Sequence, residues 1–125
     1  MGFTGTSVLV VGGAGFVGSA LVRRLLAAEP RRIVIVDNLL SADIGNVPEH
    51  PGVDFVLGSI AADKVLAALP RDLDYVFHLA CYHGNQSSIH DPLADHQNNT
   101  LTSLKLFDAL KDFTSLKKVV YAAAG

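Results

Sequence analysis

Short runs of Val, Ile and Leu alternate along the chain with longer segments whose apolar residues recur every three or four positions. The short runs are continuously apolar, which is typical of parallel strands covered on both faces. The longer segments have the spacing of helices with one apolar face. Strands that alternate with helices predict right-handed crossovers and an α/β fold with a doubly wound parallel sheet. The expected strands are Ser7–Val11, Ile33–Val36, Val53–Leu57, Tyr75–Leu79 and Lys118–Ala122.

Two of the expected helices are long enough to indicate a buried face. The first covers about residues 15–28 and ends at Glu29-Pro30, because the residue before a proline avoids helical geometry. The other covers about residues 92–111, where Asp91 suits the N-cap and Pro92 the first helical position. The residues expected along the apolar stripes are Val17, Leu21, Leu25 and Ala28 in the first helix, and Leu93, Gln97, Leu101, Leu104 and Leu110 in the other.

The remaining segments and the composition fit one domain of 125 residues. A short helix is expected at residues 62–69, and residues 39–51 are expected to form a loop. The net charge of −2, without a long run of one sign, argues against nucleic acid as a partner. No segment has the features of a signal peptide or a membrane span. Cys81 is the only cysteine, so we expect no disulfide, a small core thiol and a cytoplasmic protein.

The first apolar run leads directly into the glycine-rich sequence VVGGAGFVGS, residues 10–19. Gly12, Gly15 and Gly18 have the spacing G-x-x-G-x-x-G between an expected strand and an expected helix. Glycines in this context allow a tight turn, a close approach of the backbone to a pyrophosphate and close packing of the helix on the sheet. The helix N-terminus then presents free N–H groups to the phosphates. The pattern therefore predicts a Rossmann-type dinucleotide site.

A carboxylate stands at the distance that such a site requires. The second expected strand is followed by Asp37, about 20 residues after the glycines. A carboxylate there accepts hydrogen bonds from the adenosine ribose and repels a 2′-phosphate, so it favours NAD over NADP. Asn38 comes next and is expected to line the same pocket. The alternative interpretation of Asp37 is a turn residue at the end of a strand.

Other phosphate and metal sites do not fit the sequence. No Gly-Lys-[Ser/Thr] follows the glycines, which excludes a Walker A loop. The histidines share no ligand spacing and one cysteine cannot build a zinc site, so we expect no metal. His78 closes an apolar strand and is interpreted as a core histidine rather than as a base.

Four segments together resemble a known family. VVGGAGFVGS, VDNL, VFHLA and the segment from Ser88 to Ser103 are similar to the N-terminal half of the extended short-chain dehydrogenases. More narrowly, they resemble the NAD-dependent nucleotide-sugar epimerases and dehydratases. The resemblance covers nearly the whole chain, and it implies NAD as cofactor and a nucleotide sugar as substrate.

The resemblance also implies roles for individual residues. The glycines, with backbone help from Phe16 and Val17, would hold the pyrophosphate. The remaining cofactor contacts would come from Asp37 and Asn38 at the ribose, Ser59 and Ile60 at the adenine, Leu79, Ala80 and Cys81 at the nicotinamide, and His83 and Asn99 nearby. Ser88 and Ala124 would lie on the substrate side. Ser59 stands where the family often has an Asp, and Asn99 fits equally well as a residue that braces a neighbouring loop.

The sequence departs from the family in its catalytic residues. The family uses a Tyr-x-x-x-Lys pair, but the residues four positions after Tyr75, Tyr82 and Tyr121 are Leu, Gln and Gly. Alanines also stand where the family places a Ser or Thr after the fifth strand. We therefore expect no catalytic residue and no turnover from this stretch alone.

These observations lead to one main hypothesis and one alternative. The chain would be the NAD-binding portion of a longer epimerase or dehydratase, with a sheet ordered 3-2-1-4-5 that stops after the fifth strand. The apolar surface left beside that strand would favour self-association, and a homodimer could form through the helix at 92–111. The alternative is a complete, non-catalytic dinucleotide-binding module or sensor.

Overall fold

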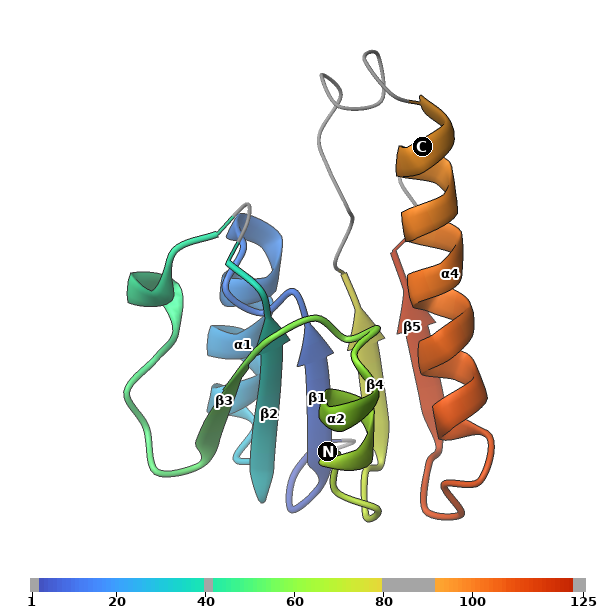
Figure 1. Cartoon of the computed structure of the whole chain (residues 1–125). Helices are drawn as coiled ribbons and strands as arrows, with labels where there is room; N and C mark the ends of the chain where they lie inside the picture. The colour runs from blue at the N-terminus through green and yellow to red at the C-terminus, as the bar shows by residue number, and fades with distance from the viewer. Residues whose placement is uncertain (1–2, 40–41, 80–91, 123–125) are drawn as a thin grey trace.

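The computed structural model describes residues 3–39, 42–79 and 92–122, with side chains in the last range described from residue 100 onward. Its centre is a sheet of five parallel strands in the order β3-β2-β1-β4-β5 (Figure 1). This order confirms the predicted fold class and topology. The strands are β1 (Ser7–Val11), β2 (Arg32–Asp37), β3 (Val53–Leu57), β4 (Tyr75–His78) and β5 (Lys118–Tyr121).

Helices cover the two faces of the sheet. Helix α1 (Phe16–Ala27) lies on one face, whereas α2 (Asp63–Ala67) and α4 (Pro92–Leu110) lie on the other (Figure 1). Because side chains alternate along a strand, β1 contributes to both cores. Val8 and Val10 pack with Val22 and Leu25 of α1. Among the described residues, no helix is long and apolar enough to cross a membrane.

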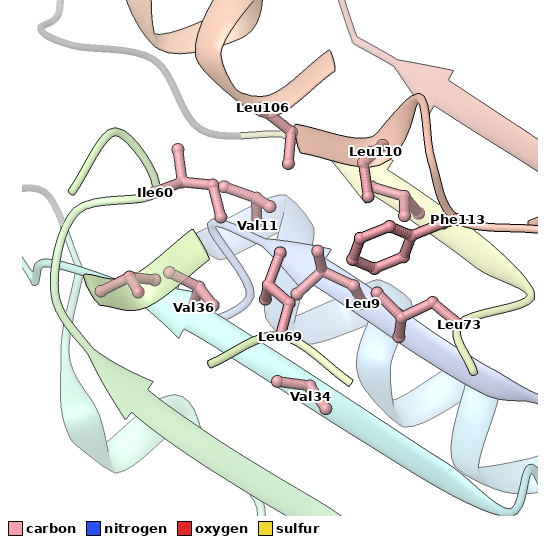
Figure 2. Close-up of a cluster of buried hydrophobic side chains, with 12 residues drawn as sticks. Leu9, Val11, Val34, Val36, Ile60, Leu69, Leu73, Leu106, Leu110 and Phe113 are labelled. Carbon is pink, nitrogen blue, oxygen red and sulfur yellow. The ribbon is translucent and has the colours of Figure 1, made fainter. Parts of the chain in front are cut away.

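The second core lies between the sheet and α4. Figure 2 shows Leu106 and Leu110 of α4 on the side of the sheet where Leu9 and Val11 of β1 lie. Phe113, which follows the helix, belongs to the same cluster. Residues far apart in the sequence therefore hold this face together.

The predicted boundaries are nearly correct, with small differences at the ends. Strands β4 and β5 each end one residue before the predicted boundary. The N–H group of the next residue still forms a hydrogen bond to the neighbouring strand in both cases. Leu79 N–H donates to Val11 O at 2.9 Å, and Ala122 N–H donates to His78 O at 3.1 Å. Helix α2 is shorter than predicted, since Ala62 is extended and serves as its N-cap. The loop expected at 39–51 contains a 3₁₀ turn, η1 (Ile44–Asn46), which the sequence analysis missed.

The apolar stripe predicted for α1 was correct only in part. Leu25 is buried, and Leu21 is partly buried and packs against the same core. Val17 is 66% exposed, and the other buried positions of the helix are Gly18, Ser19 and Val22. The helix turns this face to the sheet because Gly18 approaches the backbone of Gly12 more closely than any side chain would allow.

The stripe predicted for α4 was also correct only in part. Leu110 is buried as predicted, but Leu101 is 56% exposed and Leu104 is 60% exposed. Leu106, which was not part of the predicted stripe, is buried. The side chains of Leu93 and Gln97, and the expected N-cap Asp91, lie outside the described residues. The buried positions continue the line of Ser103, which contacts His78 of the sheet.

His78 is a buried polar residue between the sheet and α4, where most of the packed side chains are apolar. The ring is 1% exposed, and its Nε2 lies within hydrogen-bonding distance of Ser103 Oγ at 3.1 Å. Its centroid is 5.2 Å from that of Tyr121 and 6.3 Å from that of Phe107. Burial lowers the pKa of His78 below its ordinary value of 6.5. The structure thus agrees with a neutral core histidine.

We expect His78 to make the folded chain less stable in acid. Because its pKa is lowered on folding, the unfolded chain binds a proton that the folded chain does not as the pH falls below about 6.5. Urea unfolding should therefore give a lower unfolding free energy for the parent chain at pH 5.5 than at pH 7.5. The His78→Asn variant should show a smaller decrease between the two pH values. An equal decrease in the parent chain and in His78→Asn would contradict the expectation.

Candidate cofactor-binding site

The candidate site lies at the carboxyl ends of the central strands. The chain builds the sheet outward from β1 through β2 to β3, and then continues on the other side of β1 with β4. The carboxyl ends of β1 and β4 therefore flank the point where the direction of strand order changes. In open α/β sheets, ligands bind in the crevice at this point.

Three of the four glycines between the end of β1 and the first turn of α1 are required by contacts or geometry within the protein itself. Gly12 has a φ of 87°, and its N–H donates to Val36 O at 2.8 Å. A Cβ on Gly13 would lie 2.7 Å from Cγ2 of Ile35. A Cβ on Gly18 would overlap the carbonyl oxygen of Gly12. Turn geometry and close packing therefore explain these three positions.

Gly15 is different, because the surrounding protein leaves room for a side chain. A Cβ there would meet only the carbonyl oxygen of Gly12, at an ordinary contact distance of 3.4 Å, among the described residues. Its φ of −76° and ψ of 177° are accessible to any residue. Folding does not require a glycine at this position, so the bare backbone is available to a ligand.

Gly15 is also the N-cap of α1. It has no side chain to accept hydrogen bonds, so the first-turn N–H groups lack the capping oxygen that Ser, Thr, Asp or Asn supplies. Phe16 and Val17 of this turn point away from the core, and Phe16 is 91% exposed. Unpaired N–H groups and the positive end of the helix dipole form a site suited to phosphate.

Asp37 lies at the end of β2 and faces this loop. Its Oδ2 accepts from Ala14 N–H at 3.1 Å, and its Oδ1 accepts from Leu39 N–H at 2.9 Å. The turn-residue interpretation is therefore supported by the contact with Leu39. An ionised carboxylate has about four acceptor positions, so Asp37 can still accept hydrogen bonds from ribose hydroxyls. Asn38 follows it on the exposed side of the loop.

The residues expected at the adenine have different surroundings. Ser59 is exposed, and its Oγ accepts from Ala61 N–H at 3.1 Å. Ile60 is only 3% exposed and belongs to the core cluster on the α4 face (Figure 2). Ser59 can thus reach a ligand through its hydroxyl, whereas Ile60 has little surface left for one.

The nicotinamide and substrate side is described only in part. Leu79 is half-buried and continues β4 toward the crevice. Asn99 lies within α4, but its side chain is not among those described. The residues that lie outside the described ranges are Ala80, Cys81, His83, Ser88 and Ala124.

Asn46 is a site residue that the sequence analysis missed. It belongs to η1, and its Nδ2 donates to the carbonyl oxygen of Ala14 at 2.9 Å. Asp43 and Gly45 are ordinary turn signals and could have indicated the 3₁₀ turn. No local pattern indicates its partner, because Ala14 lies far away along the chain. Among the described residues, no group of His, Cys, Asp or Glu could hold a metal ion.

The two packing situations in the glycine loop predict different effects of an added methyl group. Gly15→Ala should fold normally, with an unfolding free energy that changes by no more than about 1 kcal/mol. The gain from fewer unfolded conformations is opposed by the lower preference for alanine at a helix N-cap. Gly18→Ala should lower the unfolding free energy by about 1–3 kcal/mol or more, because the helix must move away from Gly12. Urea unfolding of both variants measures this difference, and a similar loss for both would contradict our interpretation of Gly15.

Comparisons with known proteins agree with this arrangement. Residues 8–125 match the NAD dependent epimerase/dehydratase family. The enzyme WbmF of Bordetella bronchiseptica, whose crystal structure was solved in complex with NAD+, is 63% identical in sequence to this chain. The two structures superpose with a TM-score of 0.94 over 100% of this chain and 38% of WbmF. UDP-glucose 4-epimerase of Streptococcus mutans is 32% identical over 94% of this chain and 35% of its own length.

A dehydratase is also among the relatives. The dTDP-glucose 4,6-dehydratase of Streptomyces antibioticus is 37% identical over 82% of this chain and 33% of its own length. The chain thus spans about a third of the length of these curated relatives. The family match over nearly all residues confirms the resemblance carried by the glycine loop and Asp37. The chain belongs to the NAD-dependent epimerase/dehydratase family.

Proposed function

We propose that this chain binds NAD as the cofactor-binding portion of a nucleotide-sugar epimerase or dehydratase. The observation that carries the proposal is Gly15, a glycine that the fold does not require, at the uncapped N-terminus of α1. The carboxylate of Asp37 faces the same loop from the end of β2. The similarity to WbmF supports the proposal, because that enzyme was crystallised with NAD+ and also with NAD+ and UDP.

Each part of the site has a separate task in this proposal. The bare backbone at Gly12, Gly15 and Gly18, with the N–H groups of Phe16 and Val17, holds the pyrophosphate. Asp37 and Asn38 bind the adenosine ribose. The remaining assignments are Ser59 at the adenine, with Ile60 in the core behind it, Leu79, Ala80 and Cys81 at the nicotinamide, His83 and Asn99 beside it, and Ser88 and Ala124 toward the nucleotide sugar.

The chemistry is divided between the cofactor and the protein. NAD supplies the capacity to accept a hydride from a sugar carbon and to return it. The residues of this chain bind and orient the cofactor. The sequence contains no Tyr-x-x-x-Lys. None of these 125 residues is therefore expected to act as the acid/base residue.

Electrostatics at Asp37 favour NAD over NADP. A carboxylate that accepts hydrogen bonds from the ribose would lie beside the 2′-phosphate of NADP, and two negative groups at this distance repel each other. The two N–H groups that Asp37 already binds hold the carboxylate in place against this repulsion.

Calorimetric titration of the chain tests the proposal. We expect saturable binding of NAD and binding of NADP that is at least about tenfold weaker. Gly15→Val should abolish NAD binding, because its side chain occupies the space left for the pyrophosphate. Asp37→Asn should reduce the difference in affinity between NAD and NADP, because the amide keeps one acceptor oxygen and removes the negative charge.

Ser59 provides a variant that separates local from general effects. Ser59→Ala should leave the preference for NAD over NADP unchanged, because the hydroxyl is uncharged. In the same samples, an epimerisation assay with a nucleotide sugar should show no turnover. Absence of NAD binding by a folded chain would refute the proposal, and turnover would refute the assignment of the acid/base residue.

The second part of the proposal is a homodimer through α4. Leu101, Leu104 and Phe107 form an exposed apolar face on this helix, with Val120 and Tyr121 of β5 also exposed. Contiguous apolar surface of this kind marks interaction sites on soluble proteins. A second copy of α4 would cover it.

Sedimentation over a range of concentrations tests the dimer. We expect self-association of the parent chain that Leu104→Glu weakens at least about tenfold, because the charge would be buried in the interface. Ala20→Glu makes the same change of charge on α1, at an exposed position on the opposite face, and should have no effect. Equal association of both variants would rule out α4 as the interface.

A further inference from the structure

The peptide groups around Ala14, in the middle of the glycine loop, are held from two sides. Ala14 is fully buried, and its N–H donates to Asp37 Oδ2 at 3.1 Å. Its carbonyl oxygen accepts from Asn46 Nδ2 at 2.9 Å. Asp37 was expected near this loop, whereas Asn46 comes from a separate turn that the proposed function does not use.

The turn that carries Asn46 is itself anchored. Asp43 Oδ1 accepts from Gly45 N–H at 2.9 Å, and Asn46 N–H donates to the carbonyl oxygen of Asp43 at 3.0 Å. Val47, the next residue, packs against the apolar core on the α1 face. The amide of Asn46 is therefore presented to the loop from a fixed point.

The hydrogen bond from Asn46 acts on the peptide group from which α1 begins. The carbonyl of Ala14 and the N–H of Gly15 belong to one planar peptide unit. That N–H donates to the carbonyl oxygen of Gly12 at 3.2 Å, so the unit is held at both ends. Gly15 has no side chain to restrict its backbone, so its conformation depends on the hydrogen bonds of its peptide groups, including the one from Asn46.

We propose that Asn46 is a positioning residue for the pyrophosphate of the cofactor. By fixing the peptide between Ala14 and Gly15, it sets the direction of the first N–H groups of α1 before a ligand arrives. A loop that is already ordered loses less conformational freedom on binding, which raises affinity. This inference rests on the proposed function, because it assumes that the loop binds a dinucleotide.

A purely structural role would have a different consequence. If Asn46 only tied its own turn to the rest of the protein, its loss would lower stability and leave ligand binding by the folded chain unchanged. The two roles are separable because Asn46 is only half-buried. It borders a groove of about 550 Å³, also lined by Phe16, Ser19 and Arg23, so a longer amide has room.

Three variants test the inference in the 125-residue chain. Asn46→Ala removes the amide, and Asn46→Gln restores a donor from one methylene further away. Ile44→Ala is the matched control, since Ile44 lies in the same turn and is exposed. Amide hydrogen exchange by NMR at residues 14 and 15 and calorimetric affinity for NAD are measured for each variant, with thermal unfolding to confirm folding.

We expect Asn46→Ala to weaken NAD binding about threefold to tenfold, the usual effect of losing one hydrogen bond. Exchange of the two amides should be faster by a similar factor. Asn46→Gln should recover part of both losses, and Ile44→Ala should show neither.

Unchanged affinity and unchanged exchange in a folded Asn46→Ala chain would overturn the inference. Weaker binding without faster exchange would overturn it as well, because the loop would then be ordered without Asn46. If the parent chain itself does not bind NAD, the proposed function fails and the role of Asn46 with it. If instead the parent chain and Asn46→Ala bind NAD with the same affinity, only the role of Asn46 fails and the proposed function stands.

Discussion

The contact between Gly18 and the carbonyl of Gly12 determines how closely α1 lies on the end of β1. No side chain fits between these two backbones, so the helix approaches the sheet at the shortest distance that its backbone allows. This approach decides which residues of α1 are buried. It also brings the uncapped start of the helix to the carboxyl end of the strand, where an anion can meet both. The rest of the candidate site is arranged around this one contact.

Asp37 shows how one side chain can serve the fold and a ligand together. Its two oxygens bind N–H groups of the glycine loop and of the turn that follows β2. These bonds fix the orientation of the carboxylate, and they leave acceptor positions on both oxygens unused. The interpretations of Asp37 as a turn residue and as a ribose ligand are therefore not in conflict. A carboxylate that is already oriented loses little freedom when ribose hydroxyls reach it.

The topology and the glycine loop could be predicted because both depend on local patterns. Continuous apolar runs indicate buried parallel strands, and the spacing of Gly12, Gly15 and Gly18 implies a turn before a helix. The buried faces of α1 and α4 could not be predicted in this way. Periodicity does not distinguish Leu104 from Leu106, and the difference comes from contacts with distant segments. Leu106 packs in the core with Leu9 and Val11, and Ser103 of the same helix lies 3.1 Å from His78. Asn46 was missed for a similar reason, since its partner is distant in the sequence.

The two cores differ in how much of the chain they need. Among the described residues, the core on the α1 face consists of residues between Phe3 and Leu79, whereas the core on the other face also contains Leu106, Leu110 and Phe113. During synthesis, a chain that had reached Leu79 would already contain every described member of the first core, with Gly15, Asp37 and Asn46 beside it. Its opposite face would still lack Leu106, Leu110 and Phe113. Proteins are made from the N-terminus and their early units fold first. The order of elements along this chain therefore places the phosphate-binding loop in the half that can become ordered early, and leaves closure of the sheet to α4.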